Sequence, residues 1–154
     1  LMDEPFGALD PIIRTRAQED LRRIQQALGS TIILVTHDME EAIRLGDRVA
    51  VMDGGKLVQH ATPAEIITHP ATDFVADMVG DVERPLRLLS LTPLAEVMED
   101  GPASGTPLPR EANLRDALSA CLWTGRRAVP ITDKGKIIGR VTLDAIRARA
   151  EVHA

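Results

Sequence analysis

The chain has 154 residues, enough for one ordinary domain or two small ones, and its 44% hydrophobic residues can build a packed core. A formal net charge of −5 argues against a nucleic-acid partner, because phosphate binding needs clustered Lys and Arg. The lone Cys121 excludes an intramolecular disulfide and is typical of a reducing compartment. With no apolar run near the roughly 20 residues of a membrane span and no visible signal peptide, we expect a cytosolic protein.

The first part of the chain alternates strand and helix patterns. Asp10 is the predicted cap of a helix that Gly29 ends. The β-branched apolar run at 31–35 predicts a central parallel strand covered on both faces. Asp38, with Glu41 three residues later, predicts a capping box at the start of a short helix. The apolar stripe of the first helix consists of Ile13, Ala17, Leu21, Ile24 and Leu28.

The following residues continue this alternation. Two apolar runs around Asp-Gly-Gly at 53–55 predict a β-hairpin. Thr62 and Glu65 form a second predicted capping box, and a further short helix over 73–79 ends at Gly80. The order strand, helix, strand, helix, hairpin, helices indicates an α/β layer fold, with a parallel sheet and flanking helices.

The composition changes after Gly80. Pro and Gly are frequent in 99–110, which predicts a loop or linker. Asn113 then caps a predicted helix, two apolar runs surround a turn at 133–135, and a final helix begins at about Leu143. These elements predict a small α+β unit of βαββα type.

Candidate chemistry lies in Asp3, Glu4 and His37. Adjacent carboxylates at the end of a strand point in different directions, so Asp3 could reach a Mg²⁺ shell while Glu4 faces an attacking water. His37 follows the next strand, one crossover helix later, and parallel strands end at the same edge of a sheet. From the residues alone, a solvated acidic turn, a surface histidine and a plain helix cap at Asp38 remain open beside nucleotide hydrolysis.

The stretch "LMDEPFGALD" resembles the Walker B motif and D-loop of ABC transporter ATPases, and "VTHD" resembles their switch histidine. The resemblance covers residues 1–80 and implies a site for ATP and Mg²⁺. It implies that Asp3 holds Mg²⁺ through water, that Glu4 is the catalytic base and that His37 contacts the γ-phosphate. Asp10 would lie in the D-loop, at the nucleotide, and communicate across an ATPase dimer.

The stretches "DPIIRTRAQEDLRRIQ", "THDMEEAIRLGDRVAVMDGGKLVQ" and "TPAEIITHPATDFVADMVG" resemble the ATPase subunits of quaternary-amine importers. Such subunits serve glycine betaine, proline or choline uptake, and another ABC importer is the alternative. The resemblance implies a homodimer bound to a membrane permease at the cytoplasmic face of the inner or plasma membrane. A periplasmic or lipid-anchored substrate-binding protein would be an indirect partner.

The tail "LRDALSACLWTGRRAVPITDKGKIIGRVTLDAI" resembles one CBS motif. The expected organisation is ATPase over 1–80, linker and start of the CBS region over 81–112, and CBS-like motif over 113–154. Nucleotide-binding copies of this family carry an acidic residue three positions after the Thr matched by Thr142, where this chain has Ala145. We therefore expect a dimerisation or ionic-strength-sensing module, with nucleotide sensing as the alternative.

Other motifs of the ABC ATPase family do not occur in these 154 residues. They contain no Gly-rich phosphate loop, no glutamine lid and no Leu-Ser-Gly-Gly-type signature. We therefore expect the chain to be the C-terminal portion of a longer ATPase. Alone, it should bind ATP negligibly, be inactive and tend to aggregate, since a parallel sheet without its first strands leaves an apolar edge.

Overall fold

The computed structural model describes residues 1–151, and the chain divides into two compact units, Leu1–Ile66 and Ile67 onward. No helix among the described residues combines the length and apolar character needed to cross a membrane. The boundary between the units falls within helix α3 (Pro63–Thr68).

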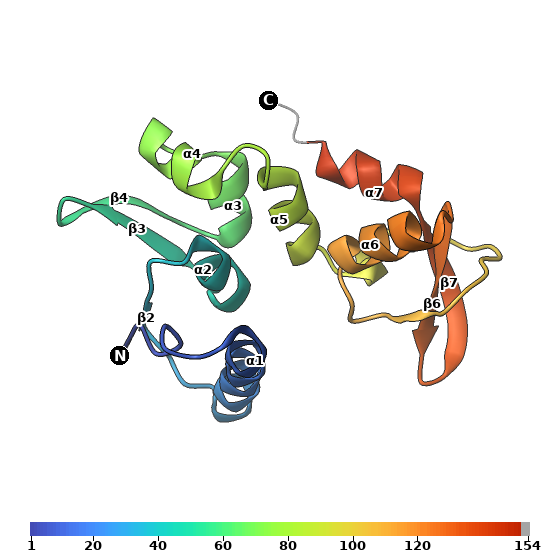
Figure 1. Ribbon diagram of the computed structural model, residues 1–154, viewed down its shortest axis with the longest axis horizontal. Coiled ribbons are helices and arrows are strands. Elements are labelled where there is room, and N and C mark those ends of the chain that lie inside the picture. The colour runs from blue at the N-terminus through green and yellow to red at the C-terminus, as the bar shows by residue number, and fades with distance from the viewer. Residues whose placement is uncertain (152–154) are drawn as a thin grey trace. The chain divides into compact units, whose positions relative to one another are not determined.

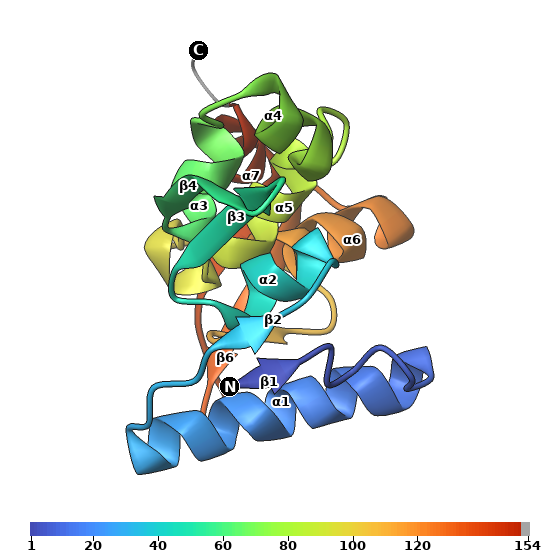
Figure 2. The same ribbon diagram turned by 90° about the vertical axis from the view of Figure 1, so that its left-hand side faces the viewer.

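The first unit contains two small sheets and two helices (Figures 1 and 2). Its elements are β1 (Met2–Asp3), α1 (Pro11–Leu28), β2 (Leu34–Val35), α2 (Met39–Leu45), β3 (Val49–Asp53) and β4 (Lys56–Ala61). Strands β1 and β2 pair in parallel, with Met2 opposite Leu34 and Asp3 opposite Val35. Strands β3 and β4 form the predicted antiparallel hairpin. The mixed α/β order expected from the sequence is therefore confirmed.

The ends of α1 follow from their capping residues. Asp10 Oδ1 accepts hydrogen bonds from the backbone N–H groups of Ile12 (3.0 Å) and Ile13 (3.1 Å), which would otherwise lack partners. Gly29 adopts the left-handed conformation, with φ +60°, and its N–H donates to the Gln25 carbonyl. Both predicted limits of this helix are confirmed.

The expectation of a central strand covered on both faces is wrong for the described residues. Strand β2 is limited to Leu34–Val35, and it pairs with β1 alone. Both strands of this two-stranded sheet are edges, and the side chains of Ile33 and Val35 are exposed. The apolar stripe of α1 is also largely uncovered, and the only buried residue of this helix is Gln18, which lies outside the stripe.

One of the two predicted capping boxes forms completely. The Thr62 N–H donates to Glu65 Oε2 (2.9 Å), and the Glu65 N–H donates to Thr62 Oγ1 (3.3 Å). At α2, Asp38 caps the helix as predicted, but the return bond is missing. The Asp38 N–H donates to Thr36 Oγ1 instead, because the Glu41 side chain bonds elsewhere.

The second unit has a three-stranded sheet with the order β5-β6-β7 (Figure 1). Strands β5 and β6 are parallel, whereas β6 and β7 are antiparallel, which confirms the predicted βαββα order. Its elements after α3 are α4 (Asp73–Val79), α5 (Arg84–Leu91), the 3₁₀ turn η1 (Leu94–Glu96), β5 (Leu108–Pro109), α6 (Leu114–Thr124), β6 (Ala128–Asp133), β7 (Lys136–Thr142) and α7 (Leu143–Ala150).

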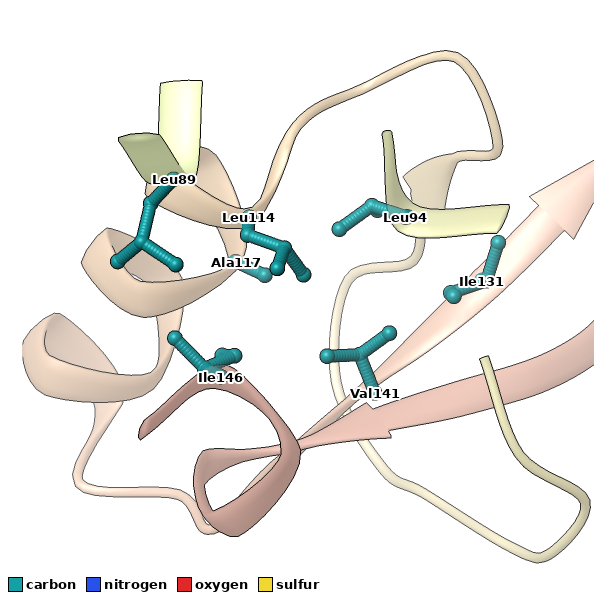
Figure 3. Packing of buried hydrophobic residues seen from close by; sticks show 7 residues of the cluster. All are labelled: Leu89, Leu94, Leu114, Ala117, Ile131, Val141 and Ile146. Carbon is teal, nitrogen blue, oxygen red and sulfur yellow. The ribbon is translucent and has the colours of Figure 1, made fainter. Parts of the chain in front are cut away.

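The core of the second unit is a cluster of buried aliphatic side chains (Figure 3). Its members are Leu89, Leu94, Leu114, Ala117, Ile131, Val141 and Ile146. Leu89 belongs to α5 and Leu94 to η1, two elements within 81–112 that the sequence patterns did not predict. Glu83 at the start of α5 is not a typical capping residue and makes no side-chain capping bond, so a proline in the first turn was the remaining local signal for this helix.

Candidate functional site

The candidate site lies where β1 and β2 end side by side. Asp3 is the last residue of β1, and Glu4 follows it. His37 comes two residues after the end of β2. The Glu4 N–H donates to the Val35 carbonyl (2.9 Å), which extends the pairing beyond the strands. This parallel arrangement places the carboxyl ends of both strands at one edge, where α/β sheets hold ligands.

Glu4 and His37 are in direct contact. Glu4 Oε1 accepts a hydrogen bond from the His37 backbone N–H (3.1 Å) and lies 2.6 Å from His37 Nδ1. The second carboxylate oxygen, Oε2, has no hydrogen-bond partner within residues 1–151. The His37 side chain is 82% exposed and that of Glu4 is 40% exposed, so water screens the pair. The contact therefore orients the two groups more than it stabilises the fold.

The contact changes the acid–base behaviour of the histidine. The hydrogen bond to Glu4 raises the pKa of His37 above its ordinary value, and the negative charge of Glu4 adds to this effect. More distant Asp38 and Glu41 charges raise the pKa further, whereas desolvation opposes the shift. His37 therefore keeps its second ring proton to a higher pH than an ordinary histidine, and Nδ1 is the ring atom that faces Glu4.

The backbone of Glu4 is unusual for a residue with a side chain. Its φ of +44° lies in the left-handed region, which non-glycine residues seldom adopt. A tight turn follows, in which the Gly7 N–H donates to the Glu4 carbonyl (3.3 Å) and the side chain of Phe6 is buried. Such backbone strain is typical of functional sites, where the surroundings hold a side chain in one orientation.

Asp3 offers a second exposed carboxylate at this edge, next to that of Glu4. In the part of the chain that the structure describes, no three His, Cys, Asp or Glu side chains form a metal-binding group. Mg²⁺ commonly takes one or two protein carboxylates and completes its shell with water and substrate phosphates. A hard oxygen ligand such as Asp3 fits that chemistry.

The predicted site residues are not all brought together. Glu4 contacts His37, and the backbone places Asp3 next to them. Asp10 instead caps α1, and among residues 1–151 its side chain has no bond to the other three.

Sequence reasoning missed a buried polar pair beside the site. Gln18 Nε2 donates to Glu41 Oε1 over 2.8 Å, which joins α1 to α2. Both side chains are buried. The only sequence signal is a polar residue directly next to the apolar stripe of α1, which normally indicates a solvated face.

Comparison with known proteins identifies relatives over most of the chain, although no family model matches it. The chain is 46% identical over 134 residues to the glycine betaine uptake system ATP-binding protein of Escherichia coli, covering 86% of this chain and 44% of that protein. It is 41% identical over 138 residues to the carnitine transport ATP-binding protein of Listeria monocytogenes, covering 90% and 34%. The trimethylamine N-oxide transport system ATP-binding protein of Ruegeria pomeroyi is 37% identical over 138 residues, covering 90% and 40%.

These relatives are ATP-binding subunits of transporters, which agrees with paired carboxylates at the ends of parallel strands. By sequence, the chain belongs to the ATP-binding subunits of ABC transporters, and the names of these relatives refer to glycine betaine, carnitine and choline. The chain spans less than half the length of the relatives it matches.

Proposed function

We propose that residues 1–80 carry the water-activating part of an ATP-hydrolysing site, with Glu4 as the general base. The observation that carries this proposal is the contact of Glu4 Oε1 with both the ring and the backbone of His37. These bonds occupy Oε1 and leave Oε2 to accept a proton from an attacking water. His37 Nε2–H can then donate to a γ-phosphate oxygen as negative charge develops there.

Asp3 would hold a Mg²⁺ ion, which would neutralise charge on the phosphate oxygens of ATP when bound. Asp10, at the end of the turn that follows Glu4, would contact the nucleotide region and communicate with a second copy of the subunit. Its capping bonds support this role by fixing where the turn ends and α1 begins.

The wider assignment is an energy-coupling subunit of an importer for glycine betaine, proline or choline. The names of the relatives, which include glycine betaine uptake and carnitine transport, support a small quaternary amine as the transported solute. The subunit would act as a homodimer on a membrane permease, at the cytoplasmic face of the membrane. A substrate-binding protein would deliver the solute to that permease.

Turnover is best measured in a hybrid in which this chain replaces the matching segment of the Escherichia coli relative, since the chain spans 44% of that protein. Glu4→Gln should lower kcat for ATP hydrolysis by about 100-fold or more while ATP binding persists. The matched control is Asp20→Asn, the same acid-to-amide change on the surface of α1. Unchanged turnover in Glu4→Gln would refute the role of Glu4.

We also propose that the CBS-like motif at 113–154 regulates or dimerises the subunit. The observation that favours it is a separate aliphatic core beneath a βαββα arrangement, to which Leu89 and Leu94 also contribute. The last three residues of the motif lie outside the described part of the chain. Deleting 81–154 from the hybrid should abolish the dependence of hydrolysis on ionic strength while basal hydrolysis survives. An unaltered salt response would assign this unit a structural role only.

A further inference from the structure

Polar contacts join the two helices that flank the candidate site. Helix α1 begins after Asp10, and α2 begins directly after the His37–Asp38 pair. The contacts between these helices or their caps are Arg14 with Asp38 at 4.0 Å, Gln18 with Glu41 at 2.8 Å, and Arg44 with Glu19 at 3.2 Å. Arg14 and Gln18 are four positions apart and share a face of α1, with Glu19 next to Gln18. Their partners at α2 are spaced by three and share one face.

The middle contact differs from the other two in burial. Gln18 is 5% exposed and Glu41 is 6% exposed, whereas the outer pairs face water. A buried carboxylate is tolerated only with a hydrogen-bond partner, and a bond to an ionised acceptor is stronger than a neutral one. On α1, Gln18 is the only buried residue, although this helix carries several exposed aliphatic side chains. A polar bond therefore fixes α1 to α2 where apolar packing would be usual.

The hydrogen bond between Gln18 and Glu41 bears on the candidate site because α2 begins directly after His37 and Asp38. Asp38 caps α2, so the position of this helix determines where the adjacent His37 lies. We propose that Gln18 and Glu41 are positioning residues, whose buried hydrogen bond holds α2 against α1 and so holds His37 at Glu4. The catalytic meaning of that placement rests on the proposed function, but the placement itself does not.

The first test uses the 154-residue chain and needs no nucleotide. The pKa of His37, followed by NMR titration, reports the contact with Glu4, because Glu4 is the main cause of its elevation. The informative variant is Gln18→Met, which breaks the bond without removing a charge. Substituting Glu41 would be ambiguous, since the Glu41 charge itself raises this pKa. The charged groups that act on His37 are Glu4, Asp38 and Glu41.

We expect the pKa of His37 to fall toward its ordinary value in Gln18→Met. The double variant Gln18→Glu/Glu41→Gln restores an amide-to-carboxylate bond with its direction reversed. It should restore the contribution of Glu4 to the pKa of His37, whereas the smaller contribution of the Glu41 charge is lost from that position. The matched control is Gln26→Met, the same substitution at an exposed position of α1, and it should change nothing. If Gln18→Met does not fold, Gln18→Asn, whose amide is one methylene too short, takes its place.

A role limited to stability predicts a different result. Gln18→Met would then melt at a lower temperature while the pKa of His37 stayed elevated, and that outcome overturns the proposal. The hybrid adds a second readout, in which Gln18→Met should lower kcat by about 100-fold and leave KM for ATP almost unchanged. If Glu4→Gln leaves turnover intact, the proposed function fails, whereas the NMR result still decides the positioning role.

Discussion

Truncating Leu114 to alanine should strongly destabilise the second unit. Leu114 is fully buried at the first turn of α6, and its side chain points into the cluster with Leu94 and Ile131 (Figure 3). Leu→Ala at such sites lowers the free energy of unfolding by about 2.7–5.0 kcal/mol. The loss has two parts, the burial of the removed atoms and the cavity that the surrounding side chains fill only partly. We expect about 3 kcal/mol here. At about 4–8 °C per kcal/mol for a unit of this size, Tm should fall by about 12–24 °C.

Amide NMR signals of α6, β6 and β7 during heating measure this transition separately from the rest of the chain. The control is Leu122→Ala, the same substitution on the same helix, where the side chain is 70% exposed. It should change the stability by no more than about 0.5 kcal/mol. If Leu114→Ala melted within about 4 °C of the unsubstituted chain, the buried cluster would not be the source of stability in this unit.

Three further predictions test local interactions. The pKa of His37 is raised on folding, so its contact with Glu4 stabilises the chain fully below pH 6.5, and this contribution is lost as pH rises through the folded-state pKa. The Tm difference between the unsubstituted chain and His37→Gln should therefore shrink with rising pH, and a constant difference would contradict the linkage. Gly139→Ala should cost about 1–3 kcal/mol in urea unfolding, because its Cβ would lie 2.7 Å from Met98 Cγ, and a neutral result would show that this strand relaxes freely. Asn113→Ala should cost about 1 kcal/mol by the same assay through loss of the α6 cap, with Asn113→Asp as the control that keeps the capping oxygen.

Most helix limits could be predicted because capping is local chemistry. Asp10, Thr62 and Asn113 each accept bonds from the first backbone N–H groups of their own helix, so a few neighbouring residues decide the outcome. Strand β2 and helix α5 depended on more distant groups. An apolar run at 31–35 does not reveal how many neighbouring strands will cover it, and α5 has no capping side chain.

In the candidate site, too, one contact could be predicted from the sequence and another could not. Parallel strands end at one edge of a sheet, so the meeting of Glu4 with His37 follows from the strand order. The bond between Gln18 and Glu41 does not follow from any local rule. Glu41 stands at the position of a capping-box acid, yet its side chain is taken by a residue 23 positions earlier in the chain. Tertiary pairing prevailed over the local motif there, and it gives the buried Glu41 carboxylate a hydrogen-bond partner.

The polar contact between α1 and α2 affects how firmly the residues of the candidate site are positioned. Aliphatic surfaces tolerate small sliding movements, since their attraction is non-directional. A hydrogen bond weakens steeply once its angle and distance depart from the ideal, and between buried groups no water replaces it. The Gln18–Glu41 bond therefore restricts α1 and α2 to one register. Water activation by Glu4 would need such restriction, because a displacement of about 1 Å at a catalytic group can lower a rate by about 100-fold.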